Sequence, residues 1–515
     1  MRKVTGSILF IVGVVLLSRL AQTDLEFPLD ADFRSIGMTE WRHFFTSLAP
    51  LHKPAPYIYF DGQLIANGFV GALLQWLAPK AWFPNDDAYN VAAAQIVSVL
   101  SYAGACVVFY AALLRAGVNV PIAAIVALAC LLSPQVIDMA LLRQDFLITL
   151  PMMVVFYCSV VIARDEEHTS HAVALGAALA VLATIKLTGP MFGLLPALAF
   201  VSRWRLPGSF IGTALLVFVP VYLMLMGRFV YYYTLDDWLA LYPTGVRVLT
   251  SWHELITWRF SLYYNDDLVR GHGREFIALY CFCTVALAII AIRDRDSIAA
   301  FLVLSLVAYS LYSATTMKYP RGGYHLLPLF FAVIAYAAMS LWRGRRFAML
   351  RYGSLAVIAL VMGSSVSKAV PYYQAQVSHS ENNSAALGDL WRPAQRWLSA
   401  NVKPLDRICI EVHSEWALPV AGFKTTSGPF NYPYTDGAAL ARYGPPSDTG
   451  AACDFVVLED FHRSRFAARM RQVDPANSER WEAYFRDLSN RFPPVRFETA
   501  RRAWPITWIE LYRIR

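Results

Sequence analysis

Acidic side chains with the potential for proton transfer follow the first apolar segment of this chain. Asp30 and Asp32 stand two residues apart there, and Glu26 precedes them. A carboxylate in such a place acts as a general base when it accepts the proton of an attacking hydroxyl or amine. A second acid nearby raises the pKa of the first or positions the acceptor. We predict that Asp30 or Asp32 is a catalytic base supported by Glu26; the alternative is ordinary solvated loop charge.

Basic side chains at the ends of later apolar segments complement these acids. The predicted phosphate-binding residues are Lys53, Arg143, Lys186, Lys318 and Arg321, supported by His52, Asp145, Tyr324 and His325. Such cations stabilise the charge that develops on a leaving phosphate, with arginine offering paired hydrogen bonds and lysine a point charge. The alternative is that each cation contacts lipid headgroups or snorkels to the membrane surface. No zinc, phosphate-loop or nucleophile-elbow spacing is present, so we expect no cofactor, although weak metal binding by the acidic loop stays open.

The composition that must position these residues is that of an integral membrane protein. Of the 515 residues, 57% are hydrophobic and 16% are charged, whereas soluble domains carry about 25% charge. The mean hydropathy is +0.41. Segments long enough to cross a bilayer recur to about residue 366. The net charge of +8 lies mostly in short loops between these segments, a pattern that the positive-inside rule explains without nucleic acid.

Charge patterning predicts about eleven spans, with the N-terminus in the cytoplasm and the C-terminus outside. The predicted spans are 5–21, 92–114, 118–137, 146–163, 171–189, 190–202, 208–226, 275–292, 298–316, 324–341 and 350–366. The first is expected to be an uncleaved helix, because no small-residue cleavage site follows it. Residues 56–79 are expected to lie in the interface, anchored by Trp76 and Trp82. Counting them as a span would place the later arginine clusters outside. The long external loops are then 22–91 and 227–274.

This topology places most arginines between the spans on the cytoplasmic side. They are Arg115, Arg164, Arg203, Arg205, Arg293, Arg295, Arg343, Arg345 and Arg346. The acidic stretch and the predicted phosphate-binding cations all fall on the external side. We therefore expect chemistry at the outer surface of a membrane. The charge bias and the lack of eukaryotic targeting signals favour a bacterial inner membrane.

The predicted membrane domain covers residues 1–369, and residues 370–515 are predicted to form one external α/β domain. Helical periodicity covers 389–402 and 479–492, strand-like runs cover 407–412, 455–458 and 506–514, and a loop is expected over 433–452. Cys409 and Cys453 lie in or beside strand-like runs and pair only if this domain is exported. The sequence leaves their pairing open. The remaining cysteines lie in apolar spans as packing residues.

Four short motifs follow the acidic loop in order. They are His52-Lys53-Pro54-Ala55-Pro56; Leu132-Ser133-Pro134 with Arg143-Gln144-Asp145; Ile185-Lys186-Leu187-Thr188-Gly189; and Lys318-Tyr319-Pro320-Arg321 with Tyr324 and Pro328. In this order they resemble the polyprenyl-phosphate-dependent membrane glycosyltransferases of the GT-C class, such as lipid A aminoarabinose transferases and protein O-mannosyltransferases. Two departures are Ile185 in place of a threonine and Asp30-Ala31-Asp32 in place of an adjacent Asp-Glu pair. The second leaves the base undecided between Asp30 and Asp32.

The resemblance implies an inverting sugar transfer from a polyprenyl-phosphate donor to an external acceptor. That acceptor is a glycolipid such as lipid A or lipopolysaccharide, a cell-wall glycan or a protein, and the external domain helps to recognise it. One alternative is a flippase or transporter for lipid-linked sugars, which should carry charges along a path through the bilayer. Others are a membrane-anchored interaction protein, whose charged residues should tolerate substitution, and another enzyme such as a glycan polymerase or ligase.

Overall fold

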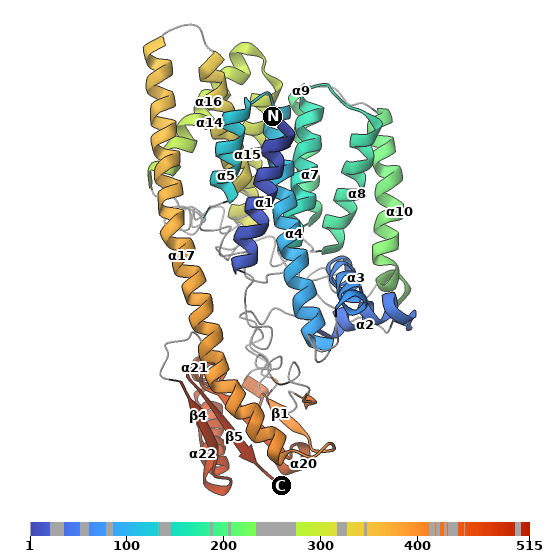
Figure 1. The fold of residues 1–515 in the computed structure, drawn as a ribbon, viewed down its shortest axis with the longest axis vertical. Helices are drawn as coiled ribbons and strands as arrows, with labels where there is room; N and C mark the ends of the chain where they lie inside the picture. The colour runs from blue at the N-terminus through green and yellow to red at the C-terminus, as the bar shows by residue number, and fades with distance from the viewer. Residues whose placement is uncertain are drawn as a thin grey trace. The chain divides into compact units, whose positions relative to one another are not determined.

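The structure is a computed structural model of the chain (Figure 1). It describes residues 2–20, 35–51, 61–78, 86–131, 133, 146–185, 189–203, 208–232, 274–316, 327–343, 348–410, 418, 423–426, 430, 441–447, 449–499 and 506–515. These residues form two compact units. The first, the helical unit, contains residues 36–72 and 93–376 together with the first helix; the second contains 73–92 and the tail, residues 377–515.

Apolar helices build the helical unit. In chain order they are α1 (Arg2–Leu20), α4 (Asp86–Arg115), α5 (Val120–Leu131), α7 (Phe146–Ala163), α8 (Thr169–Ile185), the 3-10 helix η1 (Gly189–Gly193), α9 (Leu194–Arg203), α10 (Gly208–Tyr232), α14 (Arg274–Asp294), α15 (Ser297–Thr316), α16 (Leu327–Arg343) and the start of α17 (Ala348–Asn401). Each predicted span overlaps at least one of these helices. Within the described ranges, α4, α10 and α14 are long and apolar enough to cross a membrane on their own, and most of the others are shorter apolar helices.

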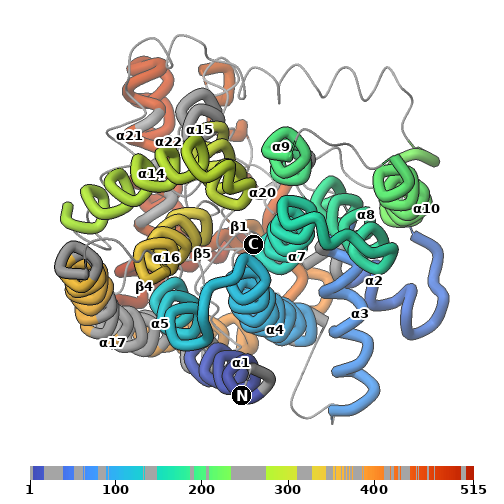
Figure 2. The backbone as a smooth tube through the Cα atoms, turned by 90° about the horizontal axis from the view of Figure 1, so that it is seen from above, coloured from blue at the N-terminus to red at the C-terminus, as the bar shows by residue number. Residues whose placement is uncertain are grey.

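The helices run alongside one another as a bundle, and Figure 2 shows them nearly end-on. Near the middle of this view, α7 packs against α8, α9 and α15. The helices α8 and α10 approach each other closely. A Cβ atom on Gly176 would lie 2.2 Å from the carbonyl oxygen of Ala214. A residue without a side chain is needed there, as at many helix crossings in membranes.

Two further helices, α2 (Ser35–Ser47) and α3 (Asp61–Leu77), lie at one end of the bundle (Figure 1). The helix α3 corresponds to the predicted interfacial helix over 56–79, whereas α2 was not predicted. The two helices pack closely, with the rings of Phe45 and Phe69 edge to face at 5.5 Å. A Cβ atom on Gly68 would lie 2.5 Å from that of Trp41. This glycine therefore sets the distance between α2 and α3.

Three helix boundaries correct the predictions. The helix α4 begins at Asp86, inside the expected loop 22–91, and α10 continues to Tyr232, inside the expected loop 227–274. The span 350–366 and the tail helix 389–402 are parts of the single 54-residue helix α17. Each extension carries the helix beyond the apolar run, because hydrogen bonding along a helix continues through polar residues where packing supports it.

The tail is an α/β domain, as predicted. Its strands are β1 (Ile408–Ile410), β2 (Thr425–Thr426), β3 (Phe455–Glu459), β4 (Val495–Glu498) and β5 (Trp508–Arg513), and its helices after α17 are α20 (Thr449–Ala452), α21 (Asp460–Val473) and α22 (Pro475–Arg491). The sheet order is β2-β1-β3-β5-β4, with β1 parallel to β2 and β3, and β5 antiparallel to β3 and β4. The predicted strands and the helix over 479–492 are confirmed. The expected loop 433–452 ends in the short helix α20.

Helices cover both faces of this sheet. Along β3, Phe455 and Val457 join a core with Trp391 of α17, while the alternate residues Val456 and Leu458 join a second core with α21 and α22. A strand buried on both faces is apolar throughout, which is why 455–458 was predictable. In the second core, Cys409 and Cys453 form a disulfide with their Cα atoms 5.7 Å apart.

Candidate functional site

All the predicted site residues lie outside the described ranges and stay predictions. They are Glu26, Asp30, Asp32, His52, Lys53, Arg143, Asp145, Lys186, Lys318, Arg321, Tyr324 and His325. The described helices that flank them nevertheless have definite directions. Those directions show where each of these segments begins and ends.

One end of the helical unit holds the described arginines that were predicted to be cytoplasmic, and we call it the arginine end. Arg115 and Arg164 both pair with Glu166, with N–O distances of 2.7 and 3.4 Å. Arg343 donates to the carbonyl oxygen of Gly117 at 2.6 Å, and Arg164 donates to that of Arg115 at 2.7 Å. The short turn between α4 and α5 is thereby tied to the ends of α7 and α16.

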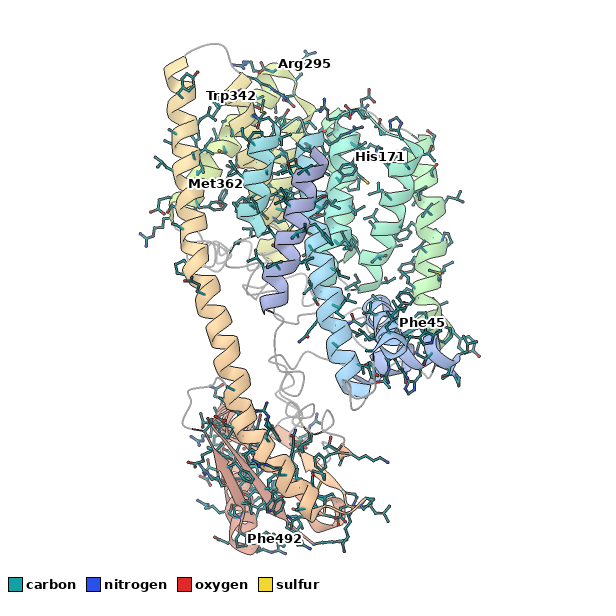
Figure 3. All side chains as sticks on the ribbon, viewed as in Figure 1. Phe45, His171, Arg295, Trp342, Met362 and Phe492 are labelled. Carbon is teal, nitrogen blue, oxygen red and sulfur yellow. A yellow bond between two sulfur atoms is a disulfide. The ribbon has the colours of Figure 1, made fainter. Side chains whose placement is uncertain are left out.

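Arg203 completes the arginine end from α9. Its guanidinium pairs with Asp165 and Glu167, and its side chain is only 8% exposed. Nearby, Ser297 at the start of α15 donates to the carbonyl oxygen of Ala163 at 2.6 Å. Figure 3 shows Arg295, Trp342 and His171 toward this end and Phe45 of α2 toward the other.

Helix direction then places the flanks of the predicted site segments at the opposite end. The helices α7 and α16 finish at the arginine end, so they begin at the opposite end with Phe146 and Leu327. The helices α5, α8 and α15 start at the arginine end, so they finish at the opposite end. Leu131, Ile185 and Thr316 are their last residues (Figure 1). These five described helix ends therefore all lie away from the arginines.

The direction of α1 can be assigned in the same way. A Cβ atom on Gly6 would lie 3.9 Å from Tyr110 and Val107, near the arginine end of α4. The helix α1 therefore starts near the arginine end and finishes at the other end with Leu20 (Figure 1). In the sequence, the first acidic residue of the stretch that holds Asp30 and Asp32 is Asp24, four residues after Leu20.

Helix α2 is attached to α10 at this opposite end, which we call the α2–α3 end. Glu40 of α2 pairs with Arg228 of α10, whose side chain is 6% exposed. The hydroxyl group of Tyr232 donates to the carbonyl oxygen of Leu51 at 3.2 Å. Leu51 immediately precedes His52 and Lys53 in the sequence. The C-terminal turn of α10 thus fixes the residue from which the predicted phosphate-binding segment departs.

Helix α3 meets α8 at the same end. A Cβ atom on Gly62 would lie 2.6 Å from the hydroxyl oxygen of Thr184 and 3.0 Å from its carbonyl oxygen. Thr184 lies two residues before Lys186. The start of α3 is therefore in contact with the last turn of α8.

Sequence reasoning missed the α2 contacts. The signal for the helix was present, because Trp41, Phe44, Phe45 and Leu48 are spaced as one apolar helical face. Nothing in the sequence paired Glu40 with Arg228, which are 188 residues apart. Tyr232 lies in the run Tyr231-Tyr232-Tyr233, and nothing in the sequence paired its hydroxyl group with the carbonyl oxygen of Leu51.

No three His, Cys, Asp or Glu side chains in the described part of the chain come together as ligands for a metal ion. The acidic loop over 24–32 lies outside that part. The expectation that no cofactor is required therefore stays a prediction.

Two solved structures share this architecture, although no family model and no curated protein matches the sequence. One is ArnT from Cupriavidus metallidurans bound to undecaprenyl phosphate, with a TM-score of 0.57, 14% identity, and coverage of 98% of this chain and 97% of that one. The other is an oligosaccharyltransferase from Archaeoglobus fulgidus in complex with Zn and sulfate, with a TM-score of 0.61, 10% identity, and coverage of 92% of this chain and 70% of that one.

The likeness extends over nearly the whole chain. Both similar structures are GT-C glycosyltransferases, so the chain has the GT-C fold that its motifs predicted. It is a membrane protein, built from apolar helices with a small C-terminal sheet. At identities of 10% and 14%, this structural likeness establishes the fold, and the reaction has to be tested.

Proposed function

We propose that the chain is a glycosyltransferase that moves a sugar from a polyprenyl-phosphate donor to an acceptor outside the cytoplasm. The observation that carries the proposal is the common end of the bundle. Helix direction brings the flanks of every predicted site segment to the α2–α3 end and the arginines to the other. The similarity to ArnT, whose structure holds undecaprenyl phosphate, supports a donor of this class.

The proposed topology has about eleven spans with the arginine end in the cytoplasm, as the positive-inside rule requires. The α2–α3 end is then at the outer surface, and α3 lies in the interface, where Trp76 is 86% exposed. The Cys409–Cys453 disulfide supports an oxidising location for the tail. A bacterial inner membrane with a periplasmic tail meets these requirements, with residues 1–369 as the membrane domain.

The proposed reaction is a single inverting displacement. Asp30 or Asp32 accepts the proton of the acceptor hydroxyl or amine, whose oxygen or nitrogen bonds to the anomeric carbon. The bond from that carbon to the phosphate oxygen breaks, and polyprenyl phosphate leaves with the electron pair. Lys53, Arg143, Lys186, Lys318 and Arg321 neutralise the charge that develops on it. Glu26, His52, Asp145, Tyr324 and His325 orient the reacting groups.

Asparagine variants of the two aspartates test the base. Asp30→Asn or Asp32→Asn should abolish transfer, because an amide cannot take up the proton, while the protein stays folded in detergent. Asp24→Asn, in the same acidic stretch, is the matched control and should keep activity. Full activity in both Asp30→Asn and Asp32→Asn would remove these residues from the mechanism.

Native mass spectrometry of the purified protein tests the donor class directly. A bound polyprenyl phosphate, or its sugar adduct, supports the proposal, and the mass of a retained sugar identifies the donor. A bound lipid together with active aspartate variants would favour a flippase. The absence of any adduct after adding polyprenyl phosphate would favour an interaction protein. Lys53→Ala should weaken donor binding in the same experiment.

A further inference from the structure

A groove of about 450 Å³ runs between α21 and α22 in the tail. Its rim and walls include Arg463, Ala468, Arg471, Ser478, Arg486 and Trp508. This volume is in the range of pockets that bind small molecules, roughly 300–1,000 Å³. The groove lies within one compact unit.

The floor of the groove is apolar and firmly held. Trp481 and Phe485 lie there and are 2% and 5% exposed. The indole N–H of Trp481 donates to the carbonyl oxygen of Tyr443 at 2.8 Å, and its ring packs edge-on to Phe466 with centroids 5.0 Å apart. A floor fixed in this way needs no rearrangement to receive a ligand.

The rim is positively charged. Three arginines and one glutamate line the groove, so their formal charges sum to +3 − 1 = +2. Arg471 pairs with Glu482 at 3.1 Å. Arg486 has no ion pair or hydrogen bond to any residue that the structure describes. It is the cation available to an incoming anion.

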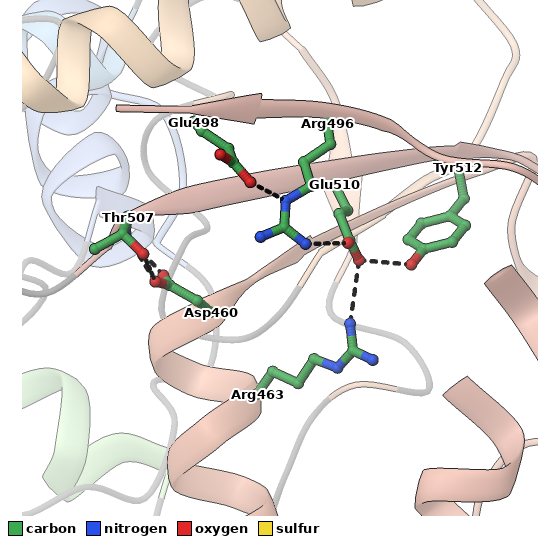
Figure 4. Close-up of polar contacts among 7 residues, drawn as sticks. All are labelled: Asp460, Arg463, Arg496, Glu498, Thr507, Glu510 and Tyr512. Atoms are coloured by element: carbon green, nitrogen blue, oxygen red, sulfur yellow. Dashed lines mark hydrogen bonds and ion pairs between the residues drawn. The ribbon is translucent and has the colours of Figure 1, made fainter. Parts of the chain in front are cut away.

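Arg463 is fixed at the sheet side of the groove. It donates to Glu510 at 3.1 Å, and its guanidinium lies 4.6 Å from the centre of the Phe485 ring. Glu510 also accepts from Arg496 at 3.1 Å and from Tyr512 at 2.7 Å (Figure 4). Because the Glu510 carboxylate has these two other donors, Arg463 can donate its remaining N–H groups to a ligand.

A buried serine also lines the groove. Ser478 lines the groove and is 3% exposed, and within the described residues its hydroxyl oxygen makes no hydrogen bond. A buried polar group without a partner costs free energy that a ligand can recover. The ligand that fits must therefore offer a hydrogen-bonding group, an apolar face and a negative charge together.

We propose that the groove binds a saccharide unit that carries a phosphate or carboxylate group. A pyranose ring presents its C–H face to the aromatic floor and its hydroxyl groups to Ser478, and its anionic group meets Arg486 and Arg463. Inorganic phosphate lacks the apolar face, and an acyl chain lacks the polar groups. The proposal rests on the external placement of the tail, where such saccharides occur, and is independent of the transfer chemistry.

Saturation-transfer NMR on the full chain in phosphatidylcholine nanodiscs tests this proposal, with glucose 6-phosphate and glucose as probes. We expect transfer to glucose 6-phosphate and at least fivefold less to glucose. Ala468→Trp, which fills the groove from an exposed position, and Arg486→Ala should each reduce the signal at least fivefold. Arg480→Ala removes the same charge from α22 outside the groove and should leave the signal unchanged. Thermal unfolding checks that each variant is folded.

Three results would overturn the proposal. One is an equal signal in wild type, Ala468→Trp and Arg486→Ala, which would place binding elsewhere. Another is complete competition by equimolar inorganic phosphate, which would reveal an anion site without saccharide selectivity. The third is loss of the signal in phosphatidylglycerol nanodiscs, which would assign the groove to a lipid headgroup. The NMR experiment contains no sugar donor or acceptor, so a negative result does not contradict the proposed transferase. Inactive aspartate variants, in turn, do not contradict the proposed saccharide site.

Discussion

The two ends of the helical unit are held by different kinds of interaction. At the arginine end, guanidinium groups pair with carboxylates and with backbone carbonyls from the ends of several helices. At the α2–α3 end, close glycine contacts set the spacing. Two polar contacts, Glu40–Arg228 and Tyr232–Leu51, attach α2 and Leu51, four residues beyond its end, to α10.

Charged side chains therefore have different roles at the two ends. At the arginine end, nearly every described arginine has a protein partner, so these charges fix the bundle. At the other end, we expect the cations of the predicted site to face an anionic substrate, and the framework around them is built from packing. Substitutions at the first end should therefore change stability, and substitutions at the second should change activity.

The largest expected effect is that of Arg203→Ala at the arginine end. The change leaves Glu167, whose side chain is 13% exposed, without its guanidinium partner, and breaking a buried pair costs about 3–4 kcal/mol. Thermal unfolding in detergent measures the loss, with transfer per folded molecule unchanged. Arg293→Ala is the control. Arg293 is 71% exposed and, among the described residues, pairs with its neighbour Asp294, so its loss should change stability little. Equal losses in both variants would contradict the structural role of this end.

Gly68→Ala should be next in size and should act at the α2–α3 end. Its new Cβ atom would meet Trp41 at 2.5 Å and the backbone nitrogen of Arg42 at 3.0 Å, which pushes α2 away from α3. A displacement of this kind near reacting groups costs about 100-fold in rate. The measurement is the transfer rate of the folded variant. Gly212→Ala, in α10 with nothing within 4 Å of the new atom, should keep the wild-type rate. An unaffected Gly68→Ala would show that α2 does not position the site.

Tyr232→Phe should have a smaller effect at the same α2–α3 end. It removes the 3.2 Å hydrogen bond to the carbonyl of Leu51, which is worth about 1 kcal/mol. Because Leu51 leads into His52 and Lys53, donor affinity should fall about fivefold while stability changes little. Tyr231→Phe changes the neighbouring ring, which is 82% exposed, and should have no effect. A loss in both variants would assign the effect to the external aromatic surface.

The smallest expected effect concerns the contact between Asp454 and Arg407 in the tail, which belongs to neither end of the helical unit. The pKa of Asp454 is lowered from about 3.8, chiefly because its carboxylate accepts the backbone N–H of Arg407, and the guanidinium of Arg407 adds to this. A lowered folded-state pKa means that the stabilisation is complete above pH 3.8 and is lost as the pH falls through the lower folded value. Unfolding of wild type and Asp454→Asn should therefore converge in acid. A constant difference down to the acid limit would contradict this.

Much of the helical unit was predictable because its signals are local. The apolar run 146–163 coincides with α7 (Phe146–Ala163), and the arginines that fix the topology lie beside the runs that they terminate. The helix α2 was missed because it is short and only partly apolar, and α21 because arginines dilute its pattern around Phe466 and Met470. For the site, the order of motifs predicted the fold class, which the comparisons confirm, whereas the roles of its residues stay predictions.

The sequence by itself determined where the apolar helices of the helical unit lie and which of their ends carry the arginines, because run length and flanking charge are properties of neighbouring residues. Only the tertiary structure decided that Glu40 meets Arg228, that Gly62 meets Thr184, and that a groove opens between α21 and α22. These contacts join residues far apart in the chain or depend on how two helices pack. They depend on the complementary shapes of whole helices, which no pattern within a single helix predicts.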